Sequence, residues 1–269
     1  MKLTNKSIMS LAFIQLALIF CIVAFLLLNG TFAWLAVNED VSTSGMKVDA
    51  KTTPNLVIGM TEDELSGENL QFEVSFGNVE ALNMIAVTRD ESIPDTYLKY
   101  LSSHYAIDHT TGNAKEGMTL KFEPVPATSE KVYFVDYTVY IASRFDSVDA
   151  SSLKASITVP DTVDSDYLYF NAASIDFYVG AVNSEGYRGT TSVSDSLSGE
   201  SESGVELFPD GNTIPLASDG SIKVIMRCYF DGDLQDPATG HAYITSNTVK
   251  ADVINIGVTF TATDTVSAQ

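Results

Sequence analysis

The chain has 269 residues, of which 45% are hydrophobic, and its formal net charge at neutral pH is −20. This acidity excludes nucleic acid as a partner, because binding a phosphate backbone requires a basic surface. With only two cysteines, Cys21 and Cys228, the composition also excludes a small secreted fold held together by several disulfides.

The N-terminal region has the order of an export signal. Lys2 and Lys6 precede an apolar run from Ile8 to Leu28, and no acidic residue occurs before Glu39. The positive end of such a segment stays in the cytoplasm, so the chain after about residue 33 is expected to be translocated. Beyond residue 30 the chain has all 35 acidic residues but only 13 of the 15 basic ones, an excess of 22 negative charges.

Two outcomes for this segment remain open. The apolar run has 21 residues, longer than the core of about 7 to 15 in most signal peptides and close to the roughly 20 that span a bilayer. The small residues of Thr31-Phe32-Ala33 suit a signal peptidase, which would cut between Ala33 and Trp34. Residues 1–36 are therefore predicted to be a signal peptide or a membrane anchor through residues 8–28, and residues 37–269 a single extracellular domain.

Alternating apolar and polar residues predict strands along most of this domain. The predicted strands are Lys47–Ala50, Asn55–Gly59, Leu70–Phe76, Met118–Val125, Tyr133–Ile141, Leu153–Val159, Ser174–Val182, Ile222–Phe230 and Ile254–Ala262. One short helix is predicted at Pro94–Tyr105, where Pro94 suits a first turn and the apolar residues share one face. This pattern predicts an all-β fold, an antiparallel β-sandwich or jelly roll.

The alternation of apolar and polar residues is absent between about residues 183 and 220. Ser192–Ser203 contains six serines together with glycine and acidic residues. Such composition predicts a flexible surface loop.

Candidate sites are few. The three histidines, His104, His109 and His241, do not form a recognisable zinc motif and are expected in solvated loops. Cys228 falls on the apolar face of a predicted strand, which favours a buried, unreactive thiol.

Only one constellation suggests a ligand. Asp231, Asp233 and Asp236 surround a turn after a strong strand, and carboxylates of this kind bind calcium. The alternative is an ordinary exposed turn, which also prefers Asp and Gly. No other cofactor is predicted.

Both ends of the chain resemble bacterial exported proteins related to TasA and camelysin, whose signal peptides are processed by a SipW-type signal peptidase. The resemblance rests on Asn29-Gly-Thr-Phe-Ala-Trp-Leu-Ala36, on Val41–Val48, and on the closing segments Tyr229–Asp233 and Ile254–Thr263. It covers about a third of the chain and implies a jelly-roll-like domain at the surface or in the biofilm matrix of a Firmicutes bacterium.

The resemblance also implies assembly into fibres by donation of the segment after the cleavage site to a neighbouring subunit. Trp34–Ala50 is strand-capable and suits strand addition, although the same segment could equally pair within its own sheet. The peptidase activity attributed to camelysin-like members does not carry over, because no metal motif is present to receive it. The expected function is thus non-enzymatic: a self-associating structural subunit or, alternatively, a membrane-anchored domain that binds a ligand, glycan or protein through its loops.

Overall fold

The computed structural model describes most of the chain from residue 46 onward. The described residues are 46–65, 71–76, 84–90, 98–103, 106–126, 132–145, 152–158, 168–197, 204–208, 214–236, 238–244, 248–249 and 254–263. The chain divides into two compact units, Met1–Ser42 and Thr43–Gln269, and every described residue belongs to the second. The predicted signal or anchor, with Ala33, Trp34 and residues 8–28, lies outside the described residues. Among those described, no helix is long and apolar enough to cross a membrane.

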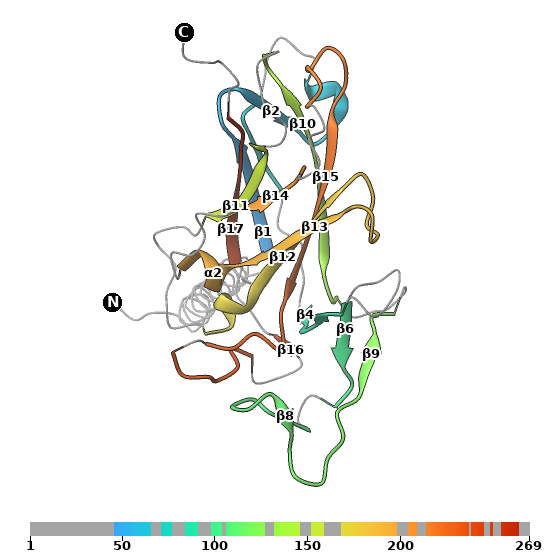
Figure 1. The fold of residues 1–269 in the computed structure, drawn as a ribbon, viewed down its shortest axis with the longest axis vertical. Coiled ribbons are helices and arrows are strands. Elements are labelled where there is room, and N and C mark those ends of the chain that lie inside the picture. The colour runs from blue at the N-terminus through green and yellow to red at the C-terminus, as the bar shows by residue number, and fades with distance from the viewer. Residues whose placement is uncertain are drawn as a thin grey trace, which may run out of the picture. The chain divides into compact units, whose positions relative to one another are not determined.

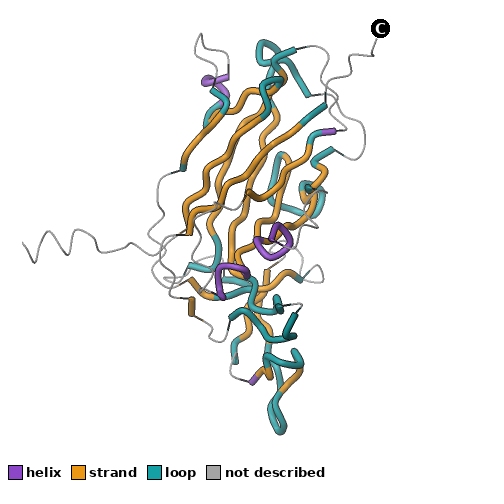
Figure 2. Tube along the Cα trace, turned by 90° about the vertical axis from the view of Figure 1, so that its left-hand side faces the viewer, coloured by secondary structure: helices purple, strands orange, loops and turns teal. Residues whose placement is uncertain are grey.

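The second unit is an all-β fold dominated by two five-stranded sheets (Figure 1). Sheet A has the order β14 (Val205–Glu206), β11 (Lys154–Thr158), β17 (Ile254–Thr261), β1 (Met46–Thr52) and β3 (Glu73–Ser75). Sheet B has the order β13 (Tyr187–Ser192), β12 (Ala173–Val179), β15 (Ile222–Phe230), β10 (Val135–Ser143) and β2 (Leu56–Gly59). Figure 2 shows the long strands running side by side, with short strands and loops beyond one end of them.

One hydrophobic core joins the two sheets. Alternate residues of the long strands point to the same face, so Val139 and Val224 of sheet B enter the same buried cluster as Val258 of sheet A. Phe177 of β12 and Phe260 of β17 meet edge to face, with ring centroids 6.4 Å apart and planes at 87°. Both rings are fully buried, and contacts of this geometry stabilise a core beyond the area that they bury.

The first and last strands of the described chain pair with each other. β1 and β17 run parallel, from Met46 beside Ile254 to Thr52 beside Phe260. The other pairings within the two large sheets are antiparallel, including that of β1 with β3 on its other side. β1 is therefore an interior strand, and its outer neighbour β3 is only three residues long.

A small lobe of short strands packs against sheet B near the C-terminal end of β15. It contains β4 (Met84–Ile85), β5 (Thr88–Arg89), β6 (Leu98–Leu101), β7 (Ile107–Asp108), β8 (Asn113–Ala114) and β9 (Phe122–Pro124). β4 also pairs with β16 (Thr248–Val249). Ile85, Val87, Leu98 and Val125 of the lobe share a second buried cluster with Tyr133 and Tyr229. β15 is consequently buried on both faces along most of its length.

All nine predicted strands correspond to strands of the structure, although β9 is much shorter than the predicted segment. The helix predicted at Pro94–Tyr105 is wrong, because Leu98–Leu101 forms strand β6, which pairs with β5 and β9. The buried ends of β6, Leu98 and Leu101, are three residues apart, a spacing that also fits a helix face.

The loop predicted at about 183–220 is wrong in part. Strand β13 and the short helix α2 (Val193–Leu197) occupy its beginning. α2 is fixed by Ser192 and Asp195, whose side chains each accept a hydrogen bond from the backbone N–H of the other residue, at 3.1 Å. This is the reciprocal pattern of a helix capping box.

Candidate functional site

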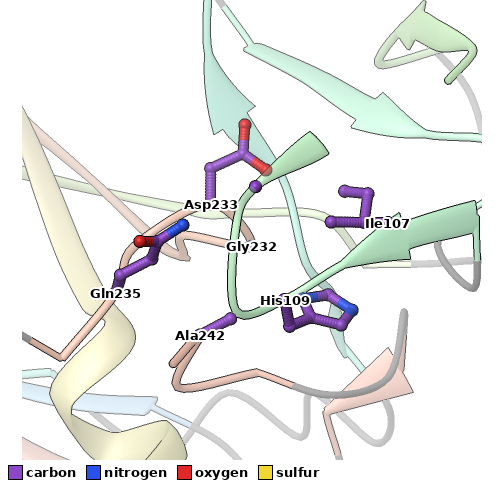
Figure 3. A pocket seen from close by; sticks show the side chains of 7 residues that line it. Ile107, His109, Gly232, Asp233, Gln235 and Ala242 are labelled. Atoms are coloured by element: carbon purple, nitrogen blue, oxygen red, sulfur yellow. The ribbon is translucent and has the colours of Figure 1, made fainter. Parts of the chain in front are cut away.

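A small pocket lies where the turn after β15 meets the β7–β8 hairpin of the lobe. It encloses about 180 Å³ and is lined by Ile107, His109, Gly112, Gly232, Asp233, Gln235 and Ala242. Figure 3 shows Asp233 and Gln235 on the turn and His109 on the hairpin, with the carboxylate and the imidazole directed away from each other. The pocket thus includes one residue of the predicted calcium constellation, Asp233, together with a predicted loop histidine.

Backbone hydrogen bonds hold these segments together. The N–H of Asp231 donates to the carbonyl of Ala172 at 2.8 Å, and the N–H of Gly232 donates to Val87 at 2.8 Å. The N–H of Ala242 donates to the carbonyl of His109 at 2.9 Å. The pocket walls come from the β7–β8 hairpin of the lobe and from the segment after β15, two regions more than a hundred residues apart in sequence.

The three carboxylates of the predicted calcium site do not converge. Asp231 Oδ1 accepts the backbone N–H of Asp233 at 3.0 Å. Asp236 accepts the N–H of Ala238 at 2.9 Å and the hydroxyl of Thr239 at 2.8 Å. These are the local hydrogen bonds of Asp in turns. Among the described residues no group of three or more His, Cys, Asp or Glu side chains is placed to hold a metal ion. These hydrogen bonds fit the ordinary-turn alternative, and calcium binding stays a prediction.

The surroundings of the pocket disfavour charge of either sign. Burial raises the pKa of Asp231 to about 6. Desolvation by the pocket walls also raises the pKa of Asp233, although the residue as a whole is exposed. Burial, with Lys115 nearby, lowers the pKa of His109. Each of these shifts favours the neutral form of its group.

The structure brings two of the three histidines near each other. His241 Nδ1 lies 3.3 Å from the hydroxyl of Thr110, the neighbour of His109. The hairpin residue His109 is partly buried at the pocket, whereas His241 is exposed. His104 lies outside the described residues. The expectation that the histidines occupy loops is confirmed for His241, and His109 follows directly after β7.

Cys228 is fully buried in the core between the sheets, as the strand pattern predicts. Burial raises the pKa of its thiol well above the ordinary value. A protonated thiol without access to solvent is a poor nucleophile. Cys228 is thus a core residue.

Sequence reasoning missed a buried polar network beneath the lobe. The carboxylate of Asp176 has no exposed surface and accepts hydrogen bonds from Tyr178 at 3.2 Å, from Tyr229 at 3.0 Å and from Thr190. Arg89, which belongs to strand β5 of the lobe, also takes part in this network. Its Nη1 lies 2.6 Å from Asp176 Oδ2. Nothing in the sequence indicates that Arg89 and Asp176, which are 87 positions apart, contact each other.

A second missed feature is an exposed arginine with two aromatic neighbours. The Arg144 guanidinium lies 5.2 Å from the ring centroid of Phe145 and 5.8 Å from that of Phe72. These phenylalanines are 48% and 38% exposed. Phe72 lies within the predicted strand Leu70–Phe76 but precedes β3 in the structure, and Phe145 follows β10. Nothing in the sequence pattern indicated that both rings lie near Arg144.

Comparison with known proteins yields no relative: no protein-family model matches the chain, and no curated protein matches it in sequence. Function must therefore be inferred from the residues and the fold.

Proposed function

We propose that this protein is an exported structural subunit of a bacterial cell surface or biofilm matrix, with a jelly-roll-like sandwich that self-associates by strand addition. The N-terminal apolar segment supports export, and the shared core of sheets A and B supports a sandwich. An ordinary all-β core without a disulfide in the exported part suits this role. Calcium is not required in this proposal.

The position of β1 carries the proposal. β1 is the first described strand after the predicted cleavage site, and it fills an interior place between β17 and β3. Only the chain preceding it tethers it on the N-terminal side. A strand at the start of a chain can leave its place and be replaced by the same strand of a neighbouring copy, which restores every ladder hydrogen bond.

A disulfide lock tests this exchange. Lys51 of β1 and Thr259 of β17 are register partners, so the double variant Lys51→Cys, Thr259→Cys places two thiols side by side. Once oxidised, β1 remains bound to its own subunit. We expect the reduced protein to form fibres, as seen by electron microscopy, and the oxidised protein to form far fewer, because strand exchange is then blocked.

Each single-cysteine variant serves as a control for the substitutions themselves. Fibres formed equally well by the oxidised double variant would overturn strand addition. If the unmodified protein were found only as a monomer under all conditions, the proposed structural role would be overturned. N-terminal sequencing of the mature protein separates a cleaved subunit from the alternative, a membrane-anchored surface domain.

A further inference from the structure

The strand directions give the second unit two distinct ends. β1 and β17 finish at the same end, near Thr52 and Thr261, and β10 finishes there too. β15 is antiparallel to β10, so its last residue and the turn after it lie at the opposite end, beside the lobe. In Figure 1 the ends of β10 and β2 are at the top, and β16 and β8 are at the bottom.

The first of these ends bears a hollow with exposed aromatic side chains. It measures about 450 Å³ and is lined by Thr53, Pro54, Asn55, Arg144, Phe145 and Ala262. Phe72 extends it, because the Arg144 guanidinium lies within cation–π reach of both the Phe72 and the Phe145 rings. We call Phe72, Arg144 and Phe145 the arginine patch.

Arg144 differs from the other three arginines of the chain. Arg89 and Arg227 bind the carboxylates of Asp176 and Asp136, and Arg188 donates to backbone carbonyls. Within the described part of the chain, Arg144 makes no ion pair and is exposed. An exposed arginine between two exposed aromatic rings has the composition of an interface hot spot.

The opposite end offers the complementary charge. The described segments 106–126 and 231–244 contain six carboxylates but only two lysines, Lys115 and Lys121. The carboxylates belong to Asp108, Glu116, Glu123, Asp231, Asp233 and Asp236. We call these two segments the acidic end. Asp233 and Glu116 are exposed there.

We propose that the arginine patch binds the acidic end of a second copy of this chain. Because the two surfaces differ and lie at opposite ends of the strands, the contact is heterologous and repeats from copy to copy into an open filament. The inference rests on the proposed self-association but names a contact that does not involve β1. Arg144 pairs with a carboxylate, and Phe72 and Phe145 lose their exposed surface to the partner.

The net charge sets the salt dependence of this contact. Two copies, each with a charge of −20, repel at long range, and the Debye length falls from about 30 Å at 0.01 M salt to about 8 Å at 0.15 M. Added salt therefore screens the repulsion while the close contact of Arg144 persists. We expect end-to-end association to strengthen over this range of salt.

Charge reversal tests the patch in the purified full chain, kept in detergent if its apolar segment is retained. Arg144→Glu should weaken association by about tenfold or more in analytical ultracentrifugation at 0.15 M salt. The matched control is Lys223→Glu, which makes the same change of charge at an exposed position of β15 outside the patch. It should change the affinity less than twofold. Equal effects of the two variants would overturn the proposal.

Photo-crosslinking identifies the partner surface. A photoreactive phenylalanine at position 145 should crosslink, in mass spectrometry, to peptides from 106–126 or 231–244 of another copy. Crosslinks to other regions, or to an unrelated protein alone, would overturn the inference. The two proposals fail separately. An association affinity that Arg144→Glu and Lys223→Glu change equally removes the patch contact and leaves strand addition. Fibres that the oxidised β1 lock forms as well as the reduced protein remove strand addition and leave the patch contact.

Discussion

Arg89 Nη1 lies 2.6 Å from Asp176 Oδ2, in an ion pair that joins the lobe to the centre of sheet B. The Asp176 side chain is fully buried, and the Arg89 side chain is 14% exposed. The Arg89 guanidinium also lies 3.3 Å from the ring centroid of Tyr187 on the edge strand β13. One side chain of the lobe thus contacts two strands of sheet B, β12 and β13.

Replacing Arg89 by methionine should destabilise the protein by about 3–5 kcal/mol, because it leaves the Asp176 carboxylate buried without its cation. Urea unfolding followed by circular dichroism measures the change. The control is Lys154→Met, which removes the exposed pair of Lys154 with Glu206 at 3.3 Å and should cost at most about 1 kcal/mol. Equal losses in the two variants would contradict a structural role for the buried pair.

Phe260→Ala should destabilise the protein by about 3–5 kcal/mol, since it leaves a cavity opposite Phe177 between the two sheets. If the alanine variant does not fold, Phe260→Leu provides a milder change that keeps most of the volume. Met118→Ala, at a residue 55% exposed, should change the free energy of unfolding by less than about 0.5 kcal/mol. A loss below 1 kcal/mol for Phe260→Ala would show that the sheets do not pack through this contact.

Cys228 should resist thiol reagents in the folded protein and react once the chain unfolds, because its thiol is buried and its pKa is raised. Peptide mass spectrometry after alkylation at pH 8 distinguishes Cys228 from Cys21. Rapid labelling of Cys228 under native conditions would indicate that the core between the sheets opens readily.

Asp231 should make stability depend on pH. Its pKa is about 6 in the folded protein against an ordinary value of 3.8, so the folded state holds a proton that the unfolded state has lost between these values. Stability from this group is therefore lost as pH rises from about 4 through 6. The full loss is about 3 kcal/mol, at about 1.4 kcal/mol per pKa unit.

The variant Asp231→Asn keeps the acceptor oxygen for the N–H of Asp233 but cannot ionise. Its stability relative to the unmodified protein should rise between pH 4 and 7, as measured by urea unfolding at several pH values. Asp236→Asn should show no such rise over this range, because hydrogen bonds from Ala238 and Thr239 lower the pKa of Asp236. The stability that Asp236 contributes is present above about pH 4 and is lost only as the pH falls further. If the free energy of unfolding of Asp231→Asn followed the same pH dependence as that of the unmodified protein, the raised pKa of Asp231 would be contradicted.

Strands with a clear two-residue period were predictable from the sequence, because the alternation in β17 records which face is buried. The segment at Leu98–Leu101 was ambiguous, since four residues are too few to separate a helical spacing from a strand. A signal for α2 was present but unused: Ser192-Val-Ser-Asp195 has the spacing of a capping box.

The site was less predictable than the fold. The sequence identified the turn at Asp231–Asp236, but the pocket also needs His109 and Gly112 from the lobe, more than a hundred residues earlier. The partners of Asp176 and the neighbours of Arg144 likewise depend on contacts that only the folded chain creates.

The pairing of β1 with β17 also has a consequence for biosynthesis. Of the described strands, β1 is the first to be made and β17 the last, and about 200 residues separate them. At about 5 to 20 residues per second, the ribosome needs roughly 10 to 40 seconds to produce the second strand after the first. During that interval β1 has only the three-residue β3 as a neighbour in sheet A. Completion of this sheet must therefore await the synthesis of β17, and a newly made chain offers β1 to other molecules before its own partner exists.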